Sequence, residues 1–205
     1  MIELDRRVVL LGLSACAAWP LQAQAQAQAA RRAAATLIGA ARRQVGVTLA
    51  YDPAYTALAF PNGDVSRAKG VCTDVLIRAY RDAFGIDLQA LVNADMRAHF
   101  SAYPKRWGLR GPDRNIDHRR VPNLQIFMAR KGAQLPLAAT SAGWRPGDIF
   151  TSLIGDRLPH IGIVSDRRGP SGNWAVIHNI GGGAREEDGL LAHKLTGRYR
   201  LMLDG

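Results

Sequence analysis

The chain has 205 residues, a formal net charge of +10 and 47% hydrophobic residues, enough apolar material for one domain with a sizeable core. Beyond the N-terminal region, no stretch of the sequence is long and apolar enough to cross a membrane. The basic residues are scattered, without a helix-turn-helix, a zinc finger or an aromatic-basic stripe, so the charge does not indicate nucleic acid as the partner.

Residues 1–25 have the organisation of a secretory signal peptide. Arg6-Arg7 form a charged n-region, Val8 to Ala18 are apolar, and Ala23-Gln24-Ala25 places small residues before a cleavage site. The sequence therefore predicts export to the periplasm by the Sec route, or by the Tat route because Asp5–Leu10 resembles an incomplete twin-arginine signal. Leu13–Cys16 also matches a lipoprotein box, which would make Cys16 the lipidated first residue. We prefer cleavage after Ala25, because the apolar stretch before Cys16 is short.

Cleavage after Ala25 removes one of the two cysteines and leaves Cys72 in the mature chain. A single cysteine in an exported protein has no internal disulfide partner, so it suggests a reactive thiol or intermolecular pairing. Outside the cytoplasm, a basic surface suits peptidoglycan or another anionic envelope component. We expect a monomer.

The chain then reads as helices followed by strands. Residues 26–35 are expected to be a flexible segment and residues 36–205 a single domain. Apolar periodicity predicts helices over 35–45, from Cys72 to a stop at Gly85, from an N-cap at Asp87, and from Pro122 to Arg130. Short β-branched and aromatic runs predict antiparallel strands at 148–154, 160–165, 174–180 and 199–203. This order predicts an α+β fold, with the cysteine helix packed on a C-terminal antiparallel sheet.

Cys72 stands at the first turn of its expected helix. Unpaired backbone N–H groups and the positive end of the helix dipole favour a thiolate there, so we expect a lowered pKa for the thiol. The alternative is that Cys72 is a small apolar residue of the core.

A catalytic cysteine needs a base, and the base needs an orienting partner. Of the five histidines, His160 and His178 fall in expected strands and become neighbours on one face if those strands pair. A histidine in a strand is, however, more often structural. His99 and His193 are expected to be structural or surface residues.

At these positions the sequence resembles the NlpC-type, papain-like cysteine peptidases. It resembles more closely the bacterial family grouped as domain of unknown function 1287, the YijF-like proteins, over roughly residues 40 to 202. The runs that carry the resemblance are Tyr51–Tyr55, Phe60–Val65, Gly70–Asp74, Asp95–Phe100, Ile116–Leu124, Pro146–Phe150, His160–Ser165 and His178–Gly181.

The resemblance implies a papain-like fold with Cys72 as nucleophile, His160 as general base and His178 as the polar third member. It also puts Tyr51 beside the oxyanion site. NlpC-type peptidases usually read Asp-Cys-Ser-Gly at the nucleophile, whereas this chain has Val71-Cys72-Thr73-Asp74, a difference that bears on the substrate class.

Asp117-His118-Arg119-Arg120 is the other stretch with chemical potential. It is either a charged loop in which Asp117 pairs internally with an arginine, or a wall of the cleft whose arginines bind substrate carboxylates. His118 also competes with His178 for the third catalytic place.

The sequence therefore predicts an exported thiol hydrolase that cleaves an amide or peptide bond in the cell envelope, with peptidoglycan stem peptides as the substrate. The alternatives are a non-catalytic envelope-binding module and a lipid acyl hydrolase or transferase. We expect no cofactor and no metal, because one cysteine and scattered histidines form no zinc pattern. Gly181–Gly183 is expected to be a turn, and Glu186–Asp188 a solvated acidic face.

Overall fold

The computed structural model describes residues 6–203, with side chains described from Gln22 onward. Helix α1 (Arg6–Arg42) runs through two units of the chain, one up to Ala34 and one from Ala35 onward. The first five residues of the expected signal peptide and the side chain of Cys16 lie outside the described part. No described helix is long and apolar enough to span a bilayer.

The backbone of residues 26–35 is helical, where we expected a flexible segment. Alanine, glutamine and arginine are strong helix formers, so the composition of this stretch favours continuation of the helix. The helix ends at Arg42, three residues before the expected Val45, and the chain turns through Gly46 at φ 79°.

The α+β class is confirmed. In the described part of the chain, six strands form one sheet in the order β3-β8-β4-β5-β6-β7, and every neighbouring pair is antiparallel. The strands are β3 (Gln134–Leu135), β4 (Ile149–Ile154), β5 (Leu158–Arg168), β6 (Trp174–Asn179), β7 (Ala184–Glu187) and β8 (Lys194–Tyr199). Two short segments, β1 (Ala50–Tyr51) and β2 (Lys69–Gly70), pair in parallel with each other.

The expected helices are present. They are α2 (Cys72–Phe84), α3 (Leu88–His99) and α4 (Val121–Arg130), with 3₁₀ turns η1 (Phe100–Ala102), η2 (Asp117–Arg119) and η3 (Ser141–Gly143). Gly85 ends α2 in the left-handed conformation at φ 70°, and the carboxylate of Asp87 accepts hydrogen bonds from the N–H groups of Gln89 and Ala90 at the start of α3. Pro122 lies in the first turn of α4, where its missing N–H costs no hydrogen bond.

Three of the four expected strands coincide with β4, β5 and β6, but the fourth was placed too late. The last strand is β8, which ends at Tyr199 because Tyr199 pairs with Ile149, the first residue of β4. Strands β3 and β7 were not expected. The first has two residues, and the Ala-Arg-Glu-Glu sequence of the second lacks the alternation of apolar residues that marks a half-buried strand.

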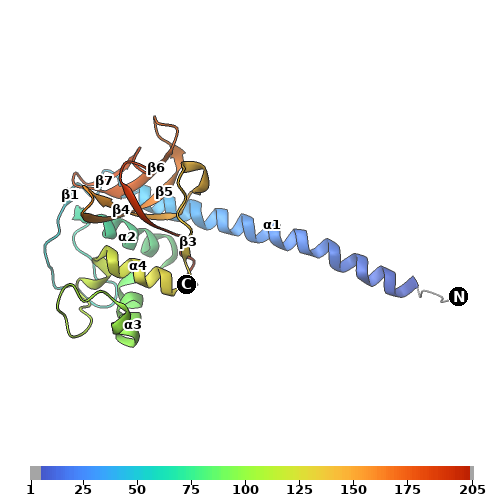
Figure 1. Cartoon of the computed structure of the whole chain (residues 1–205), viewed down its shortest axis with the longest axis horizontal. Coiled ribbons are helices and arrows are strands. Elements are labelled where there is room, and N and C mark those ends of the chain that lie inside the picture. Colours follow the sequence, from blue (N-terminus) through green and yellow to red (C-terminus); the bar gives the residue numbers. More distant parts are fainter. Residues whose placement is uncertain (1–5, 204–205) are drawn as a thin grey trace. The chain divides into compact units, whose positions relative to one another are not determined.

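Side chains of the sheet alternate between two hydrophobic clusters. Ile161, Ile163 and Ile177 pack with the helices, whereas Phe150, Val164 and Val176 form a second cluster with Trp144 and Leu190 on the other face. Figure 1 shows α2 and α4 lying along the sheet. Alternation along the strands places His160 and His178 on the same face of the sheet as Phe150. The ring centroid of Phe150 lies 6.0 Å from that of His160 and 6.4 Å from that of His178.

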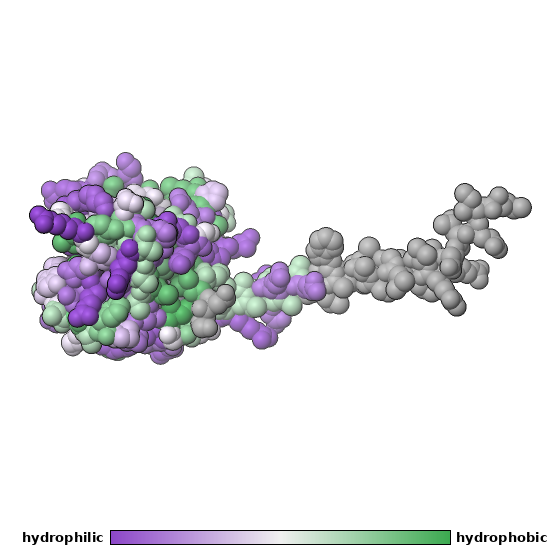
Figure 2. Space-filling view, turned by 90° about the horizontal axis from the view of Figure 1, so that it is seen from below, coloured by the Kyte–Doolittle hydropathy of each residue, from purple (hydrophilic) through white to green (hydrophobic). Residues whose placement is uncertain are grey.

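The surface of the unit from Ala35 onward carries both hydrophilic and hydrophobic side chains. On the face drawn in Figure 2, hydrophilic side chains cover much of the surface, and hydrophobic ones are interspersed among them. Exposed large apolar residues come from separate loops and strand ends, for example Leu137, Leu158 and Leu191. Exposed apolar residues scattered in this way are ordinary for a folded domain.

Candidate functional site

Cys72 is the first residue of α2, and its neighbours build the start of the helix. The carboxylate of Asp74 accepts a hydrogen bond from the backbone N–H of Val71 at 2.6 Å, which caps the first turn. A Cβ at Gly70 would lie only 2.9 Å from the same carboxylate, so the close approach needs glycine. The run Gly-Val-Cys-Thr-Asp is thus a compact helix N-terminus that fixes the position of the thiol.

Cys72 is almost completely buried, with 3% of the residue exposed. Its sulfur accepts hydrogen bonds from the backbone N–H groups of Ile161 and Thr73 and from the hydroxyl of Tyr51. Burial nevertheless raises the pKa of the Cys72 thiol to about 11. The expectation of a lowered pKa is therefore wrong: removing the thiolate from water outweighs the stabilisation from the helix start and from these donors.

His160, His178 and Glu187 form a chain across three neighbouring strands. Nε2 of His160 lies 2.8 Å from Nδ1 of His178, and Nε2 of His178 lies 2.9 Å from Oε1 of Glu187. Burial lowers the pKa of both imidazoles, that of His160 to about 3. The carboxylate of Glu187 favours a raised pKa for His178, but the opposite effect of burial is larger. Both rings are thus neutral near pH 7.

The hydrogen-bond chain assigns the tautomers of these neutral rings. A carboxylate only accepts, so Nε2 of His178 carries the proton donated to Glu187 and its Nδ1 is a lone pair. Nε2 of His160 must then donate to that lone pair. This leaves Nδ1 of His160 unprotonated, as a general base requires.

Small and polar residues hold this arrangement in place. A Cβ at Gly162 would lie 2.6 Å from the ring of Phe150 and 2.9 Å from Cβ of His178, so glycine is needed between the two rings. The buried amide of Asn179, the residue after His178, donates to the carbonyl of Gly70 at 3.0 Å. Strand β6 is thereby tied to the segment that leads into Cys72.

The charged stretch 117–120 is largely engaged inside the protein. Arg119 binds both carboxylate oxygens of Asp74 at 2.9 Å, and Arg120 binds Asp117 at 2.8 Å. Burial raises the pKa of Asp117 and lowers that of His118 to about 4. The structure therefore has the internal pairing that we considered for Asp117, and it puts His178 rather than His118 against His160.

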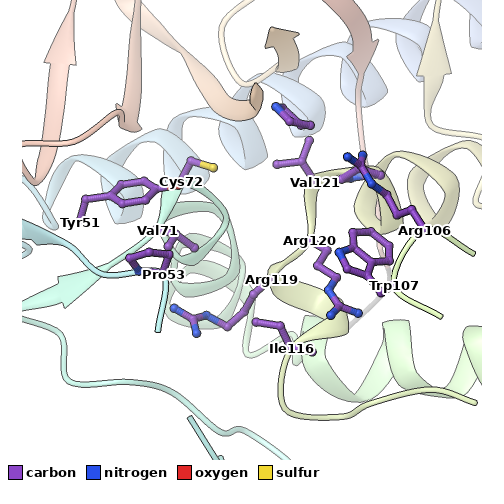
Figure 3. A pocket seen from close by; sticks show the side chains of 12 residues that line it. Tyr51, Pro53, Val71, Cys72, Arg106, Trp107, Ile116, Arg119, Arg120 and Val121 are labelled. Atoms are coloured by element: carbon purple, nitrogen blue, oxygen red, sulfur yellow. The ribbon is translucent and has the colours of Figure 1, made fainter. Parts of the chain in front are cut away.

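A pocket of about 240 Å³ opens beside Cys72 (Figure 3). Cys72, Tyr51, Pro53 and Val71 lie on one side of it, and Arg106, Trp107, Arg120 and Val121 on the other, with Arg119 and Ile116 between them. Pro122 and Pro159 complete the lining. Three arginines and no acidic residue line this space.

The structure brings the expected residues together only in part. His160 and His178 are in direct contact, and the sulfur of Cys72 binds the amide of Ile161, the residue that follows His160. Tyr51 contacts the sulfur through its hydroxyl. The hydrogen bonds described for the sulfur are these to Ile161, Thr73 and Tyr51. The ring of His160 lies with His178 and Phe150 on the face of the sheet that points away from α2.

Sequence reasoning missed two residues. Glu187, expected on a solvated acidic face, binds His178, and its neighbour Glu186 binds Arg42 at 2.7 Å. Asp74 belongs to the Gly70–Asp74 motif, but the sequence indicates no role for its side chain. Only its spacing of three residues from Val71, which suits a helix cap, could have indicated one. Within the described residues, no group of three or more His, Cys, Asp or Glu side chains could hold a metal ion.

Comparison with known proteins agrees with the resemblance seen in the sequence. A protein called "Uncharacterized protein YijF" from Escherichia coli (strain K12) is 48% identical over 160 residues, which cover 78% of each chain. The family model described as "Domain of unknown function (DUF1287)" matches residues 38–201, a range that includes Tyr51, Cys72, His160, His178 and Glu187. The chain therefore belongs to the DUF1287 family.

Proposed function

We propose that this protein is an exported thiol hydrolase of papain-like, NlpC-type design that cleaves an amide bond through Cys72. The observation that carries the proposal is the position of Cys72: it begins α2 in the wall of a pocket, and its sulfur accepts a hydrogen bond from the backbone N–H of Ile161, the residue after His160. The His160–His178–Glu187 chain adds support, because it leaves one ring nitrogen of His160 unprotonated, as a general base requires.

The reaction begins from a neutral thiol and a neutral imidazole. The proposed reaction requires the ring of His160 to reach the thiol from the other face of β5. Its Nδ1 then takes the proton of Cys72 as the sulfur attacks the carbonyl carbon. The developing oxyanion accepts hydrogen bonds from the backbone N–H of Cys72, which has no partner within the helix, and from the hydroxyl of Tyr51. Tyr51 is suited to donate, because burial raises its pKa well above the ordinary value.

Collapse of the tetrahedral intermediate breaks the C–N bond. His160 gives its proton to the leaving amine and the acyl group stays on the sulfur as a thioester. A water molecule, deprotonated by the same His160, then attacks the thioester carbon. The products are a carboxylic acid, an amine and the regenerated thiol.

We propose peptidoglycan stem peptides as the substrate and the periplasm as the place of action. The support is the signal-peptide pattern of residues 1–25, the net charge of +10, and the arginines in the pocket, all of which suit an acidic polymer outside the cytoplasm. A lipid acyl chain fits this pocket less well, because Arg106, Arg119 and Arg120 line it.

A non-catalytic envelope-binding module is the second candidate, and the burial of Cys72 favours it. The test is to incubate the mature protein and its Cys72→Ala variant with purified peptidoglycan and with soluble stem-peptide fragments, and to identify new amino termini by mass spectrometry. New termini with the wild type alone support the hydrolase. Equal product lists with both proteins, together with equal sedimentation onto peptidoglycan, would leave the binding module.

A further inference from the structure

In the wall of the pocket that faces Cys72, the guanidinium groups of Arg106 and Arg120 both lie over the ring of Trp107. The guanidinium carbon of Arg120 lies 4.1 Å from the centroid of a Trp107 ring, and that of Arg106 lies 5.5 Å from it. Contacts of this kind hold a guanidinium over the ring while its N–H groups stay free to donate at the edge. Figure 3 shows this group across the pocket from Cys72 and Tyr51.

The three arginines of the pocket differ in their partners. Arg119 is neutralised by Asp74 and Arg120 by Asp117, each through short hydrogen bonds. Arg106 is exposed, and among the described residues no carboxylate pairs with it. Because no Asp or Glu lines the pocket, Arg106 gives it one uncompensated positive charge.

We propose that Arg106 is the specificity residue of this site and binds a carboxylate of the substrate, held on the Trp107 ring with Arg120 beside it. The substrate class is therefore an acyl donor with a free carboxylate on the side of the scissile carbonyl that faces Arg106. This inference rests on the proposed function, since it assumes that the carbonyl is attacked at Cys72. It moves the carboxylate-binding role expected for Arg119 and Arg120 to a residue outside the 117–120 stretch.

The test uses pairs of alkylating reagents that differ only in charge. N-bromoacetyl derivatives of glycine, β-alanine and γ-aminobutyrate are compared with their primary amides, so that the series also scans the distance between carboxylate and electrophile. The sulfur of Cys72 displaces bromide to give a thioether, and the thiol proton passes to buffer. The measured quantity is the ratio of carboxylate to amide rate constants, from which the intrinsic reactivity of the thiol cancels.

For the wild type we expect this ratio to exceed one for at least one chain length. It should fall by about threefold to tenfold in Arg106→Ala, the range of a charge-assisted hydrogen bond, and be partly restored in Arg106→Lys. Arg110→Ala removes an exposed arginine of the same loop that does not line the pocket, and it should keep the wild-type ratio. The proposal is overturned if Arg106→Ala and Arg110→Ala have the same ratio as the wild type.

A second measurement does not depend on the thiol. In the Cys72→Ala protein, the indole N–H resonance of Trp107, assigned with Trp107→Phe, is followed during titration with N-acetylglutamate and with N-acetylglutamine. A shift with the glutamate compound that Arg106→Ala abolishes supports the carboxylate site even if Cys72 proves unreactive, in which case the proposed hydrolase alone fails. Identical responses to both compounds would overturn the carboxylate site and leave the hydrolase standing.

Discussion

Arg119 donates two hydrogen bonds to the carboxylate of Asp74, from Nε to Oδ1 and from Nη2 to Oδ2, each at 2.9 Å. Asp74 lies two residues after Cys72. Both side chains are almost wholly buried, and the same carboxylate caps α2 through the N–H of Val71. The pair thus joins the turn η2 to the first turn of the cysteine helix. A guanidinium occupied in this way has little capacity left for a substrate.

Arg119→Ala should therefore act on stability. Removing one partner of a buried ion pair leaves Asp74 uncompensated, and we expect the free energy of unfolding to fall by about 3–5 kcal/mol. Chemical denaturation measures this value. Arg67→Ala is the matched control, because it breaks an exposed pair with Asp82 that is worth about 1 kcal/mol or less. Equal, small losses in both variants would contradict a structural role for Arg119.

Glu187→Ala should slow the alkylation of Cys72 without changing the position of the thiol. Without its carboxylate acceptor, His178 is free to protonate at Nδ1, and His160 then loses the order that leaves its own Nδ1 free. We expect iodoacetamide alkylation of Cys72 at pH 8 to be about tenfold slower. Glu187→Gln retains an oxygen acceptor and should recover most of the rate. A full rate in Glu187→Ala would show that Glu187 does not act through the histidines.

Gly162→Ala should disturb the two rings that meet at this glycine. The added methyl group would lie 2.6 Å from Phe150 and 2.9 Å from His178, so one of them must shift. We expect a loss of about 1–3 kcal/mol in unfolding free energy, together with slower alkylation of Cys72. At Gly111 a Cβ would meet nothing within 4 Å, so Gly111→Ala is the control. Matching stabilities for the two variants would contradict the close packing at Gly162.

His118 should make the protein sensitive to acid. Burial lowers its pKa from 6.5 to about 4, so the folded state binds fewer protons than the unfolded state between these values. Stability contributed by the neutral ring is present above pH 6.5 and is lost as the pH falls toward 4. His118→Gln should reduce the slope of unfolding free energy against pH in this window by up to one proton. An unchanged slope in His118→Gln would contradict the burial effect.

Cys72 should behave as a protonated thiol until alkaline pH. Its pKa in the folded chain, about 11, exceeds the ordinary value of 9.0, so the folded state keeps the proton between these values and stability declines as the pH rises through them. The rate of alkylation without substrate should accordingly keep rising above pH 9. Labelling with iodoacetamide from pH 6 to 10.5 tests this. A plateau reached below pH 8 would instead reveal a preformed thiolate–imidazolium pair.

The sequence alone located the main helices and three of the strands, and it named Cys72, His160 and His178 as candidate site residues. Apolar periodicity and cap residues located α2, α3 and α4, because helix ends are specified within a few residues of chain by groups such as Asp87 and Gly85. Alternation and turn residues located β4, β5 and β6 and put His160 and His178 in them. Short or polar strands show too little hydrophobic alternation to be recognised in a sequence. For this reason β3 and β7 were not predicted, and the last strand was predicted later in the chain than β8.

What required the tertiary structure was everything that depends on burial and on long-range contact. The thiol pKa is raised, because desolvation under the packed sheet outweighs the local effect of the helix start, which is all that a sequence reveals. Likewise the partners of Arg119 and His178 lie 45 and nine residues away along the chain, so no local pattern identifies them. Residue types thus determined which chemistry is possible, and packing decided which side chains remain free to perform it.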